Sequence, residues 1–464
     1  MSKHINKRDT EDTIVAIATA TGEAGICVIR ISGVSATDTL RKIFHPKSRT
    51  LDNPFLDRTM VYGWIIDGKQ QIDEGFACVM YGPRSFTGED VVEIHCHGGI
   101  FVSEMVLKAA MKNGSRMAEP GEFTQRAFLN GRIDLTKAEA IHDIIKATGK
   151  YGLEIAVHQL KGKLYKKIIS LKENLTQILS LINAEIEFGE EEISLPQKNI
   201  ISTKISELRK EIEEMIFSAE RGIQLKGGYN VVIAGEPNAG KSSLLNGLLE
   251  SSRAIVTDIP GTTRDTIEES FNLDGIMVSL TDTAGIRKTN DQLEIKGIER
   301  TRDALKKADL ICWVIDLSSP AFELFEVEKL DLNPVKILLV LNKSDLIKGD
   351  ISLPTNLNGY NQIKLSAHNK KDIDRLRSRL FEIAFQGDKT IVEDSFITNL
   401  RQKSAAENAL ESIKVSQDIH FNNLGEELLA QELSNALDSL KSIVGETTPD
   451  EILNHIFSNF CIGK

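Results

Sequence analysis

GEPNAGKSS, at residues 235–243, is the motif around which the central part of this chain is organised. The apolar, β-branched run NVVIA at 230–234 precedes it and predicts a strand, and SSLLNGLL at 242–249 predicts a helix. A glycine-rich loop between strand and helix, closed by Lys241 and Ser242, is the pattern of a phosphate-binding P-loop. Backbone N–H groups at the helix N-terminus would point at a di- or triphosphate. We expect Lys241 to reach the terminal phosphates and the Ser242 hydroxyl to ligate Mg²⁺.

Three further motifs follow the P-loop, and each comes directly after a predicted strand. TDTAG places Asp282 where it would hold Mg²⁺ through water, and Gly285 where its N–H would meet a γ-phosphate. In NKSD, Asp345 would accept two hydrogen bonds from guanine, which adenine does not offer. The Ser-Ala pair at 366–367 suits a backbone contact with the guanine oxygen. Together the motifs predict GTP as the ligand.

The predicted GTP contacts lie in the P-loop and in the loops that follow it. They are Asn238, Ala239, Gly240, Lys241, Ser242, Ser243, Thr257, Thr262, Thr263, Asp282, Thr283, Ala284, Gly285, Asn342, Lys343, Asp345, Ser366 and Ala367. Thr263 would ligate Mg²⁺ together with Ser242. Lys241 is also a predicted catalytic residue, since it would reach the terminal phosphates.

Two details separate the chain from the small-GTPase pattern. Ile286 follows DTAG, so the glutamine that orients water in Ras-like enzymes is missing and another residue must position the water. Asn238 and the loop TDIPGTTRD at 257–265 together offer oxygen ligands for a monovalent cation, which would act where other GTPases place an arginine finger. The alternative, that Asn238 only shapes the loop, stays open on the residues alone.

Length and periodicity divide the chain into several domains, because 464 residues are too many for one hydrophobic core. We predict an α/β and α multidomain protein with an N-terminal α/β domain, a discontinuous helical domain and an inserted Ras-like P-loop domain. The predicted bounds are 1–131 for the first, 132–225 and 385–464 for the second, and 226–384 for the third. In the N-terminal domain, β-rich runs predict strands at 13–18, 25–31, 62–66, 75–80 and 91–95, and a helix at 101–112.

Apolar residues recur at spacings of three and four from Val157 to Ile182, which predicts one long helix. Further helices are predicted at 203–220, 399–416 and 425–444. Either helical block alone would have a thin core, so we infer that both blocks form one domain interrupted by the nucleotide domain.

Composition limits the classes of protein that fit. With 41% hydrophobic and 27% charged residues, no apolar run long enough to span a bilayer and no secretory signal, a cytoplasmic protein without a membrane partner is expected. A net charge of −11 argues against a protein that coats nucleic acid nonspecifically.

The five cysteines are scattered, with no C-x-x-C pair, so neither a disulfide framework nor a thiolate zinc site is indicated. They are Cys27, Cys78, Cys96, Cys312 and Cys461. The first four are interpreted as small hydrophobic residues inside strands. Cys461 has a different context, in the sequence FCIGK.

The motifs GEPNAGKSS, GTTRD, DTAGIR and NKSD occur here with GEDVVEIHCHGG at 88–99, PGEFTQRAFLNGRIDLTKAEAI at 120–141 and FCIGK at 460–464. In this combination the chain resembles the tRNA modification GTPase family MnmE, also called TrmE. The resemblance covers essentially the whole chain. The G motifs are shared with other GTPases, whereas the N-terminal blocks and FCIGK are specific to the family.

The resemblance implies a homodimer joined through the N-terminal domain and a heterocomplex with an FAD-containing, MnmG-type partner. Such complexes add an aminomethyl or carboxymethylaminomethyl group at C5 of the wobble uridine of tRNA. The N-terminal domain of the family binds a 5-formyl or 5,10-methylene tetrahydrofolate. By motif, the folate contacts map to Arg30, Glu93, Arg132 and Lys464. Some relatives have lysine where this chain has Arg132, whose guanidinium would bind as a planar fork.

For the nucleotide site, the resemblance implies K⁺ ligands at Asn238, Thr257, Ile259 and Thr262, and a water-orienting, catalytic glutamate at Glu294. Pro260 replaces a smaller residue of some relatives, a departure that would stiffen the potassium loop. In the family, two G domains close face to face when GTP binds. We expect the same closure here, ordering the cation loop together with Glu294.

Alternatives remain at several positions. His95 and His97 are interpreted as polar strand or turn residues rather than as catalytic groups. Glu294 lies in a charged segment, where a glutamate is often simply solvated. Cys461 is either a nucleophile toward one-carbon units or an inert, packed thiol.

Two other functions are alternatives to tRNA modification. A ribosome-assembly GTPase would carry an appended RNA-binding module with a basic GXXG-type loop, and neither flank contains one. A nucleotide-gated scaffold would show negligible turnover in both potassium and sodium buffers.

Overall fold

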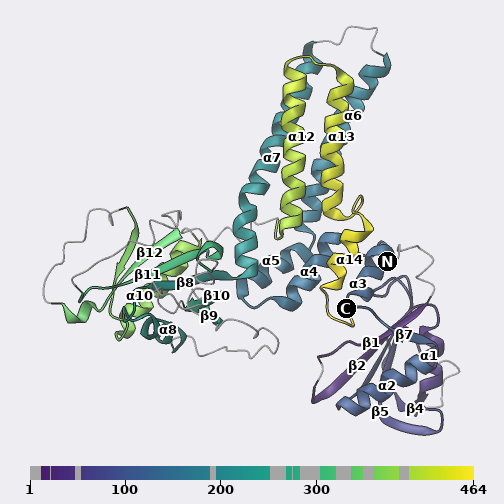
Figure 1. Ribbon diagram of the computed structural model, residues 1–464. Helices are drawn as coiled ribbons and strands as arrows, with labels where there is room; N and C mark the ends of the chain where they lie inside the picture. Colours follow the sequence, from purple (N-terminus) through teal and green to yellow (C-terminus); the bar gives the residue numbers. More distant parts are fainter. Residues whose placement is uncertain are drawn as a thin grey trace, which may run out of the picture. The chain divides into compact units, whose positions relative to one another are not determined.

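The computed structural model describes residues 12–20, 22–47, 54–188, 195–250, 268–273, 275–282, 304–319, 336–347, 359–385 and 397–464. The chain divides into two compact units. The first unit comprises residues 1–142, 159–213 and 401–464, and the second comprises 143–158 and 214–400. Each unit is built around a sheet of its own (Figure 1).

The sheet of the first unit has seven strands in the order β3-β4-β5-β6-β2-β1-β7. The strands are Thr13–Ile17 (β1), Ala24–Ser32 (β2), Phe44–Pro46 (β3), Val61–Asp67 (β4), Gln70–Met80 (β5), Val91–Gly98 (β6) and Ser115–Met117 (β7). Neighbours pair antiparallel except β1 and β7, which are parallel. All the predicted strands are therefore confirmed. The two unpredicted strands, β3 and β7, have three residues each, too few for a period-two pattern to show.

Helices α1 (Ala36–Ile43) and α2 (Ile100–Lys112) pack against one face of this sheet. Ile29 of β2 and its register partner Ile94 of β6 are buried in the core under these helices. Because successive side chains of a strand point to opposite faces, Arg30 and its partner Glu93 project from the other face. That second face is where the predicted folate contacts begin.

The other helices of the first unit come from three separate parts of the sequence. They are α3 (Glu122–Leu129), α4 (Leu135–Lys146), α6 (Lys163–Phe188), the first part of α7 (Leu195–Gly227), α12 (Leu400–Phe421), α13 (Glu426–Val444) and α14 (Asp450–Ser458). Arg209 Nη1 of α7 donates to Gln417 Oε1 of α12 at 2.9 Å. Lys172 Nζ of α6 lies 2.5 Å from Glu446 Oε1, just beyond α13. Helix α13 packs against α6, which belongs to the other helical block, and the discontinuous helical domain is confirmed (Figure 1).

The prediction of one helix from Val157 to Ile182 is wrong. Helix α5 (Lys150–Leu160) ends just before Gly162, and α6 begins at Lys163. Gly162 has φ +81°, a left-handed conformation that ends a right-handed helix and favours glycine. The apolar stripe continues across the break, so its period alone does not reveal the interruption.

The second unit contains a six-stranded sheet in the order β13-β12-β11-β8-β10-β9. Its strands are Tyr229–Gly235 (β8), Glu268–Leu273 (β9), Ile276–Asp282 (β10), Leu310–Asp316 (β11), Ile337–Asn342 (β12) and Asn361–Lys364 (β13). All neighbours are parallel except β9, which is antiparallel to β10. Helices α5, α8 (Lys241–Glu250) and α10 (Lys370–Phe385) contribute buried residues to its core. The predicted α/β nucleotide fold is confirmed.

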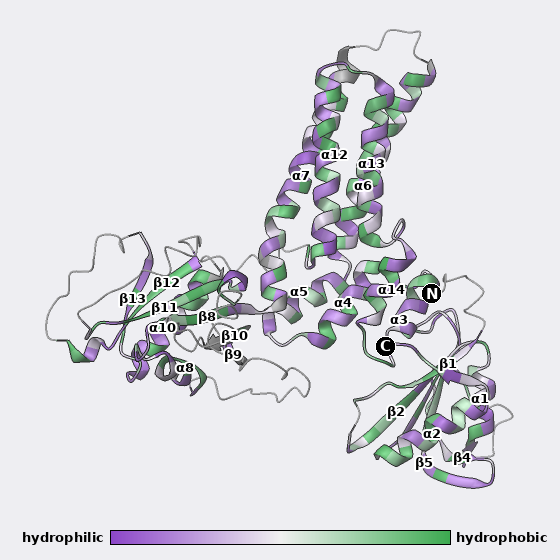
Figure 2. Cartoon of the chain, in the orientation of Figure 1, coloured by the Kyte–Doolittle hydropathy of each residue, from purple (hydrophilic) through white to green (hydrophobic). Residues whose placement is uncertain are grey.

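Strands β8, β11 and β12 are almost wholly buried, as central strands covered on both faces should be. Figure 2 shows them largely in the green of hydrophobic residues, whereas the long helices alternate green and purple. The strand order reverses on either side of β8, and ligands of such sheets bind at the carboxyl ends of strands beside this point. The P-loop begins there.

Helix α7 is longer than the predicted 203–220 and continues through position 225 without a break. The predicted boundary between 225 and 226 therefore lies inside a helix, and the domain limits remain predictions. None of the helices within the described residues combines the length and the apolar character that crossing a bilayer requires.

Candidate functional site

The P-loop joins the end of β8 at Gly235 to the start of α8 at Lys241, which confirms its predicted structural context. Gly235 has φ +140°, and a Cβ there would lie 2.2 Å from the carbonyl oxygen of Val314. Gly240 has φ +94°, and a Cβ there would lie 2.3 Å from Asn342 Nδ2. Both glycines are thus required by backbone conformation and by close approach. Asn238 is also left-handed, with φ +65°, a conformation that asparagine tolerates better than most residues.

Lys241 is only 8% exposed although it is a lysine. Its Nζ donates to the carbonyl oxygens of Gly235, at 3.0 Å, and Glu236, at 2.9 Å. These bonds hold the ammonium across the loop whose N–H groups form the predicted phosphate cradle. The side chain is therefore placed at the loop itself, where a bound phosphate would compete with the two carbonyl oxygens for the ammonium.

Asn342 connects the P-loop to the predicted guanine-binding residues. Its Nδ2 donates to the carbonyl oxygen of Ala239 at 2.8 Å, and its Oδ1 accepts a hydrogen bond from the Ala367 N–H at 3.0 Å. The side chain is 2% exposed. Both ends of the amide are thus engaged inside the protein. Asn342 positions the two loops relative to each other, a role that the NKxD spacing alone does not predict.

Asp345 lies in the short helical turn Ser344–Leu346 after β12. A hydrogen bond from the Ser366 side chain is the main cause that lowers the pKa of the Asp345 carboxyl. The group is therefore ionised at neutral pH and acts only as an acceptor. Lys343 has φ +61°, and its Nζ lies 2.6 Å from Asp316 Oδ2 at the end of β11. This ion pair holds the loop that presents Asp345.

Asp282 is the last residue of β10 and is paired in parallel register with Ile233 of β8. Its backbone therefore lies at the same edge of the sheet as the P-loop. The other predicted nucleotide, cation and water-orienting residues lie outside the described residues. These are Thr257, Ile259, Pro260, Thr262, Thr263, Thr283, Ala284, Gly285, Ile286 and Glu294.

A second site, which we call the tail site, consists of Arg30, Glu93, Gly463 and Lys464. Arg30 of β2 faces Glu93 of β6 in direct register, with Nε and Nη2 at 2.9 and 2.8 Å from Glu93 Oε1. Arg30 Nη1 also donates to the carbonyl oxygen of Gly463 at 3.2 Å. A strand residue and a residue of the FCIGK motif are thus joined through one guanidinium.

The segment FCIGK is held against the first sheet by backbone contacts. Gly463 has φ +91°, and a Cβ there would lie 2.4 Å from the carbonyl oxygen of Ile17 in β1. Phe460 is buried with Phe457, Leu135 and other apolar residues of α4 and α14. The segment is therefore fitted closely on one side and anchored by an aromatic ring on the other.

Charge and aromatic rings gather at the tail site. Burial first, and then the charge of Arg30, lower the pKa of Lys464, while Glu93 acts in the opposite direction. The Arg30 guanidinium carbon lies 5.8 Å from the ring centroids of both Phe86 and Phe123. These distances are those of cation–π contacts. The site thus combines cations, a carboxylate and aromatic faces, groups that suit a flat, polar heterocycle bearing carboxylates.

Arg132 lies apart from this contact set. Its Nε donates to the carbonyl oxygen of Ser85 at 3.1 Å, next in sequence to Phe86, and the residue is exposed. Of the four predicted folate contacts, Arg30 and Glu93 therefore meet directly, Lys464 lies within range of their charges, and Arg132 is attached to the neighbouring loop. Phe86 and Phe123 were not among the predicted contacts, although Phe123 falls inside the quoted block at 120–141.

The remaining sequence candidates are placed as follows. His95 and His97 both lie in strand β6, as expected for polar strand residues. A hydrogen bond to Asp73 raises the pKa of His97, whose Nδ1 is 2.8 Å from Asp73 Oδ1. Cys27, Cys78, Cys96 and Cys312 lie inside strands as predicted. Cys461 is exposed, and its carbonyl oxygen accepts a hydrogen bond from Gly121 N–H at 3.4 Å.

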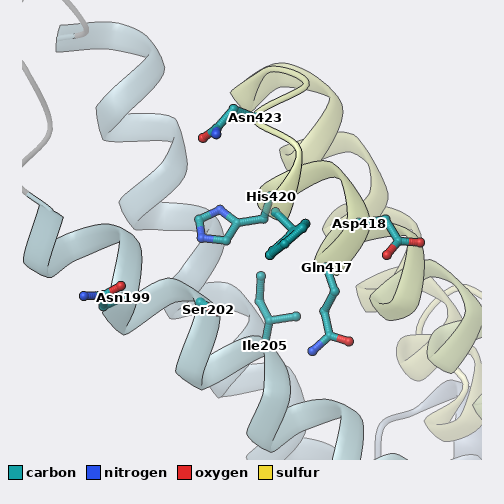
Figure 3. Close-up of a pocket in the computed structure, with 8 residues that line it drawn as sticks. Asn199, Ser202, Ile205, Gln417, Asp418, His420 and Asn423 are labelled. Carbon is teal, nitrogen blue, oxygen red and sulfur yellow. The ribbon is translucent and has the colours of Figure 1, made fainter.

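A groove of about 440 Å³ lies elsewhere, between the ends of α7 and α12 (Figure 3). It is lined by Asn199, Ser202, Ile205, Gln417, Asp418, His420, Phe421 and Asn423. None of these residues belongs to a predicted site. The groove is therefore separate from both the nucleotide site and the tail site.

A family model for the GTP-binding protein TrmE N-terminus matches residues 13–132, and one for the MnmE helical domain matches 135–461. A tRNA modification GTPase MnmE of Carboxydothermus hydrogenoformans is 43% identical over 98% of this chain and 100% of its own. One from Clostridioides difficile is 41% identical over 98% of this chain and 99% of its own.

Among solved structures, the G domain of the T. maritima FeoB iron transporter is 24% identical. The match covers 34% of this chain and 98% of that one, with a TM-score of 0.26. The nucleotide fold rests on the strand order and the P-loop described above rather than on this likeness.

Proposed function

This chain belongs to the MnmE family of tRNA modification GTPases, and we propose that it couples GTP hydrolysis to the transfer of a folate-borne one-carbon unit onto tRNA. GTP hydrolysis and tRNA modification follow from the family. The proposal adds the one-carbon source, the cations and the protein partners. The observation that carries it is the junction of Arg30, Glu93 and the FCIGK segment in the tail site.

In the nucleotide site, Lys241 stabilises the phosphates, and Ser242, Thr263 and Asp282 would hold Mg²⁺. Asn238, Thr257, Ile259 and Thr262 would hold K⁺, and Glu294 would orient the attacking water. The left-handed backbone of Asn238 supports its part of this proposal, because it gives the side chain a fixed place within the loop. Asp345, already ionised, would accept two hydrogen bonds from guanine, with Ser366 and Ala367 beside it.

In the tail site, Arg30 and Lys464 would bind the carboxylates or the carbonyl of a tetrahydrofolate, and Glu93 would accept from its ring N–H groups. The Phe86 and Phe123 rings support this fit, since they offer faces beside the guanidinium. Arg132 would reach the ligand from the neighbouring loop. A bound 5-formyl or 5,10-methylene derivative supplies the one-carbon unit. Cys461, exposed beside Lys464, is the candidate nucleophile for that unit.

Exposed aromatic residues on the second face of the first sheet support a homodimer joined through this domain. Tyr62 and Phe76 are neighbours across β4 and β5, with ring centroids 5.3 Å apart. They are 39% and 45% exposed. Phe76 pairs with His95, so these rings lie on the same face as Glu93. An exposed aromatic patch of this kind marks interaction surfaces.

The end product would be an aminomethyl or carboxymethylaminomethyl group at C5 of the wobble uridine, made together with an FAD-containing, MnmG-type partner. Family membership favours this reading over a ribosome-assembly GTPase or a scaffold without turnover. No described feature favours either alternative.

The deciding experiment is calorimetric binding of 5-formyltetrahydrofolate to the full chain and to Arg30→Ala. The wild type should bind, and the variant should lose about tenfold or more in affinity, since it loses a charged hydrogen-bonding partner. Arg58→Ala, an exposed arginine of the same domain, serves as the matched control and should bind as the wild type does. Absence of binding by the wild type would refute the folate role.

A further inference from the structure

Residues 150–158 of helix α5 (Lys150–Leu160) belong to the nucleotide-binding unit, although the chain passes through α6 and α7 before it reaches the P-loop. Ile155 is fully buried in the core of the second sheet. The same core contains Phe271 and Leu273 of β9 and Val278 of β10. Helix α5 is therefore a structural part of the GTP-binding fold, although it comes before the rest of that fold in the sequence.

The N-terminus of α5 holds the turn between β9 and β10. The Tyr151 N–H donates to the carbonyl oxygen of Gly275 at 3.2 Å. Gly275 has φ +105°, and a Cβ there would lie 3.0 Å from Lys150 Cβ and 3.0 Å from the Tyr151 ring. Helix and turn are thus in direct contact, with no room for a side chain between them.

The same turn is fixed from α10. Arg377 Nη2 donates to the carbonyl oxygen of Asn272 at 3.1 Å, and its guanidinium lies 5.6 Å from the Phe271 ring centroid. Within the turn, the Gly275 N–H donates to Asn272 Oδ1 at 2.7 Å. The turn therefore has a defined shape, supported by one helix from the P-loop domain proper and by α5.

The position of this turn in the sequence gives the contact its meaning. Strand β9 begins just after the predicted cation loop at 257–265, and β10 ends at Asp282, just before Thr283. Both GTP-sensing stretches are thus attached to one hairpin, at the end opposite the turn. Six antiparallel residue pairs, from Ile276 with Leu273 to Thr281 with Glu268, make that hairpin a stiff lever.

Helix α5 is also joined to the helical domain by short links. It also packs on the last turn of α7, which belongs to the same unit, where a Cβ on Gly152 would lie 3.3 Å from the Lys226 carbonyl oxygen. Residues 147–149 connect it to α4, and residues 161–162 connect it to α6. Helix α5 thus contacts the β9–β10 turn and is connected by short segments to α4 and α6. A displacement of the turn would therefore move α5 and, through these segments, act on α4 and α6.

We propose that α5 is the output element of the nucleotide domain, through which the GTP-bound state is transmitted from the β9–β10 turn to the helical domain. Close-packed contacts do not compress, so a shift of the hairpin displaces the helix that rests on its turn. Tyr151 and Gly275 are positioning residues in this scheme, not catalytic ones. The inference rests on the proposed coupling of GTP hydrolysis to tRNA modification.

The first test uses the unmodified full chain. Amide hydrogen exchange is measured with GDP and with the non-hydrolysable analogue GppNHp. Exchange in the peptide covering α5 should differ about fivefold or more between the two nucleotides, the lower limit of typical allosteric coupling. Equal exchange of α5 in both states would overturn the proposal.

The second test separates GTP hydrolysis from its coupling to wobble-uridine modification. Tyr151→Ala should keep GTP turnover within about threefold of wild type while lowering wobble-uridine modification in cells about tenfold. Tyr151→Phe, which keeps the ring against Gly275, should modify the wobble uridine as the wild type does. Gly275→Ala should act in the same direction as Tyr151→Ala. Gly68→Ala is the matched control, a glycine at φ +60° in a hairpin turn with nothing within 4 Å.

The outcomes are distinguishable. Wild-type modification by Tyr151→Ala, despite loss of its α5 response, would overturn the proposal. Equal loss of turnover and modification would show a merely structural role for α5 and would also overturn it. Failure of the proposed function appears separately, as absence of wobble-uridine modification or folate binding in the wild type.

Discussion

The nucleotide site and the tail site both contain charged side chains, but they differ in how far apart in the sequence their residues lie. In the nucleotide site, Lys241, Gly235 and Gly240 come from one short loop between a strand and a helix. In the tail site, Arg30 bonds to Gly463, and 433 residues separate the two. The first site depends on local backbone geometry. The second depends on a distant segment being folded back onto the first sheet.

Because of this difference, the two sites should lose function in different ways. A local loop loses function when one side chain is changed, and the rest of the protein is little affected. An assembled site also fails when the docking of the segment fails, even if every ligand-binding side chain is retained.

The largest effect is expected for Lys241→Ala. Removal of the ammonium that we propose stabilises the phosphates should lower GTP turnover by roughly 10²–10³-fold, the cost of losing one preorganised charge or donor at a transition state. Single-turnover GTP hydrolysis measures it. Binding of 5-formyltetrahydrofolate to the same variant should stay as in the wild type, and its loss would contradict the independence of the two sites.

Asp345→Asn should weaken GTP binding by about 10- to 100-fold, because an amide N–H₂ replaces an acceptor and faces the guanine donors. Xanthosine triphosphate should gain affinity, because its base carries a carbonyl at C2 where guanine carries the exocyclic amine. Competition against a fluorescent nucleotide reports both changes. The control is Asp374→Asn, an exposed aspartate on α10, which should bind both nucleotides as the wild type does.

Gly463→Ala should weaken folate binding about tenfold while GTP turnover is unchanged. The added methyl group would lie 2.4 Å from the Ile17 carbonyl oxygen, so the segment carrying Lys464 must shift although no ligand-binding side chain is altered. Gly68→Ala, with a left-handed backbone and open space, controls for strain. Unchanged folate binding in Gly463→Ala would show that docking of the segment is not required.

The smallest effect concerns pH. The Asp73 carboxylate raises the pKa of His97 above its usual value of 6.5. The His97–Asp73 pair therefore stabilises the folded state fully below pH 6.5. This stabilisation is lost as pH rises through the raised pKa of His97 in the folded state. His97→Gln should lower the thermal midpoint slightly at pH 5.5 and leave it unchanged at pH 9. A larger loss at pH 9 would contradict this sign.

The sequence predicts the strand–loop–helix context of the P-loop correctly because its signals are local. Gly235, Gly240 and Lys241 have roles that follow from spacing within a single loop. Asn342 was predicted as a contact, but its buried position between Ala239 and Ala367 depends on how β12 lies beside the P-loop. The spacing of residues along the sequence does not predict how close two neighbouring strands bring them.

The tail site was named from a resemblance, and its geometry was not predictable from residue pattern. Arg30 and Glu93 are partners because β2 and β6 are in register, which depends on strand pairing across the sheet. Phe86 and Phe123 lack any local signal that would link them to Arg30. The same holds for α5, whose apolar stripe continues that of α6 although Ile155 packs in the other unit.

The bond between Arg30 and Gly463 also has a consequence for synthesis. At typical elongation rates of 5–20 residues per second, the ribosome needs roughly 20 to 90 s to pass from one residue to the other. During that interval the strands of the first sheet have already left the ribosome, and the segment that covers Arg30 does not yet exist. A message cut short after the G-domain codons would therefore yield a chain that retains the P-loop and can never complete its tail site.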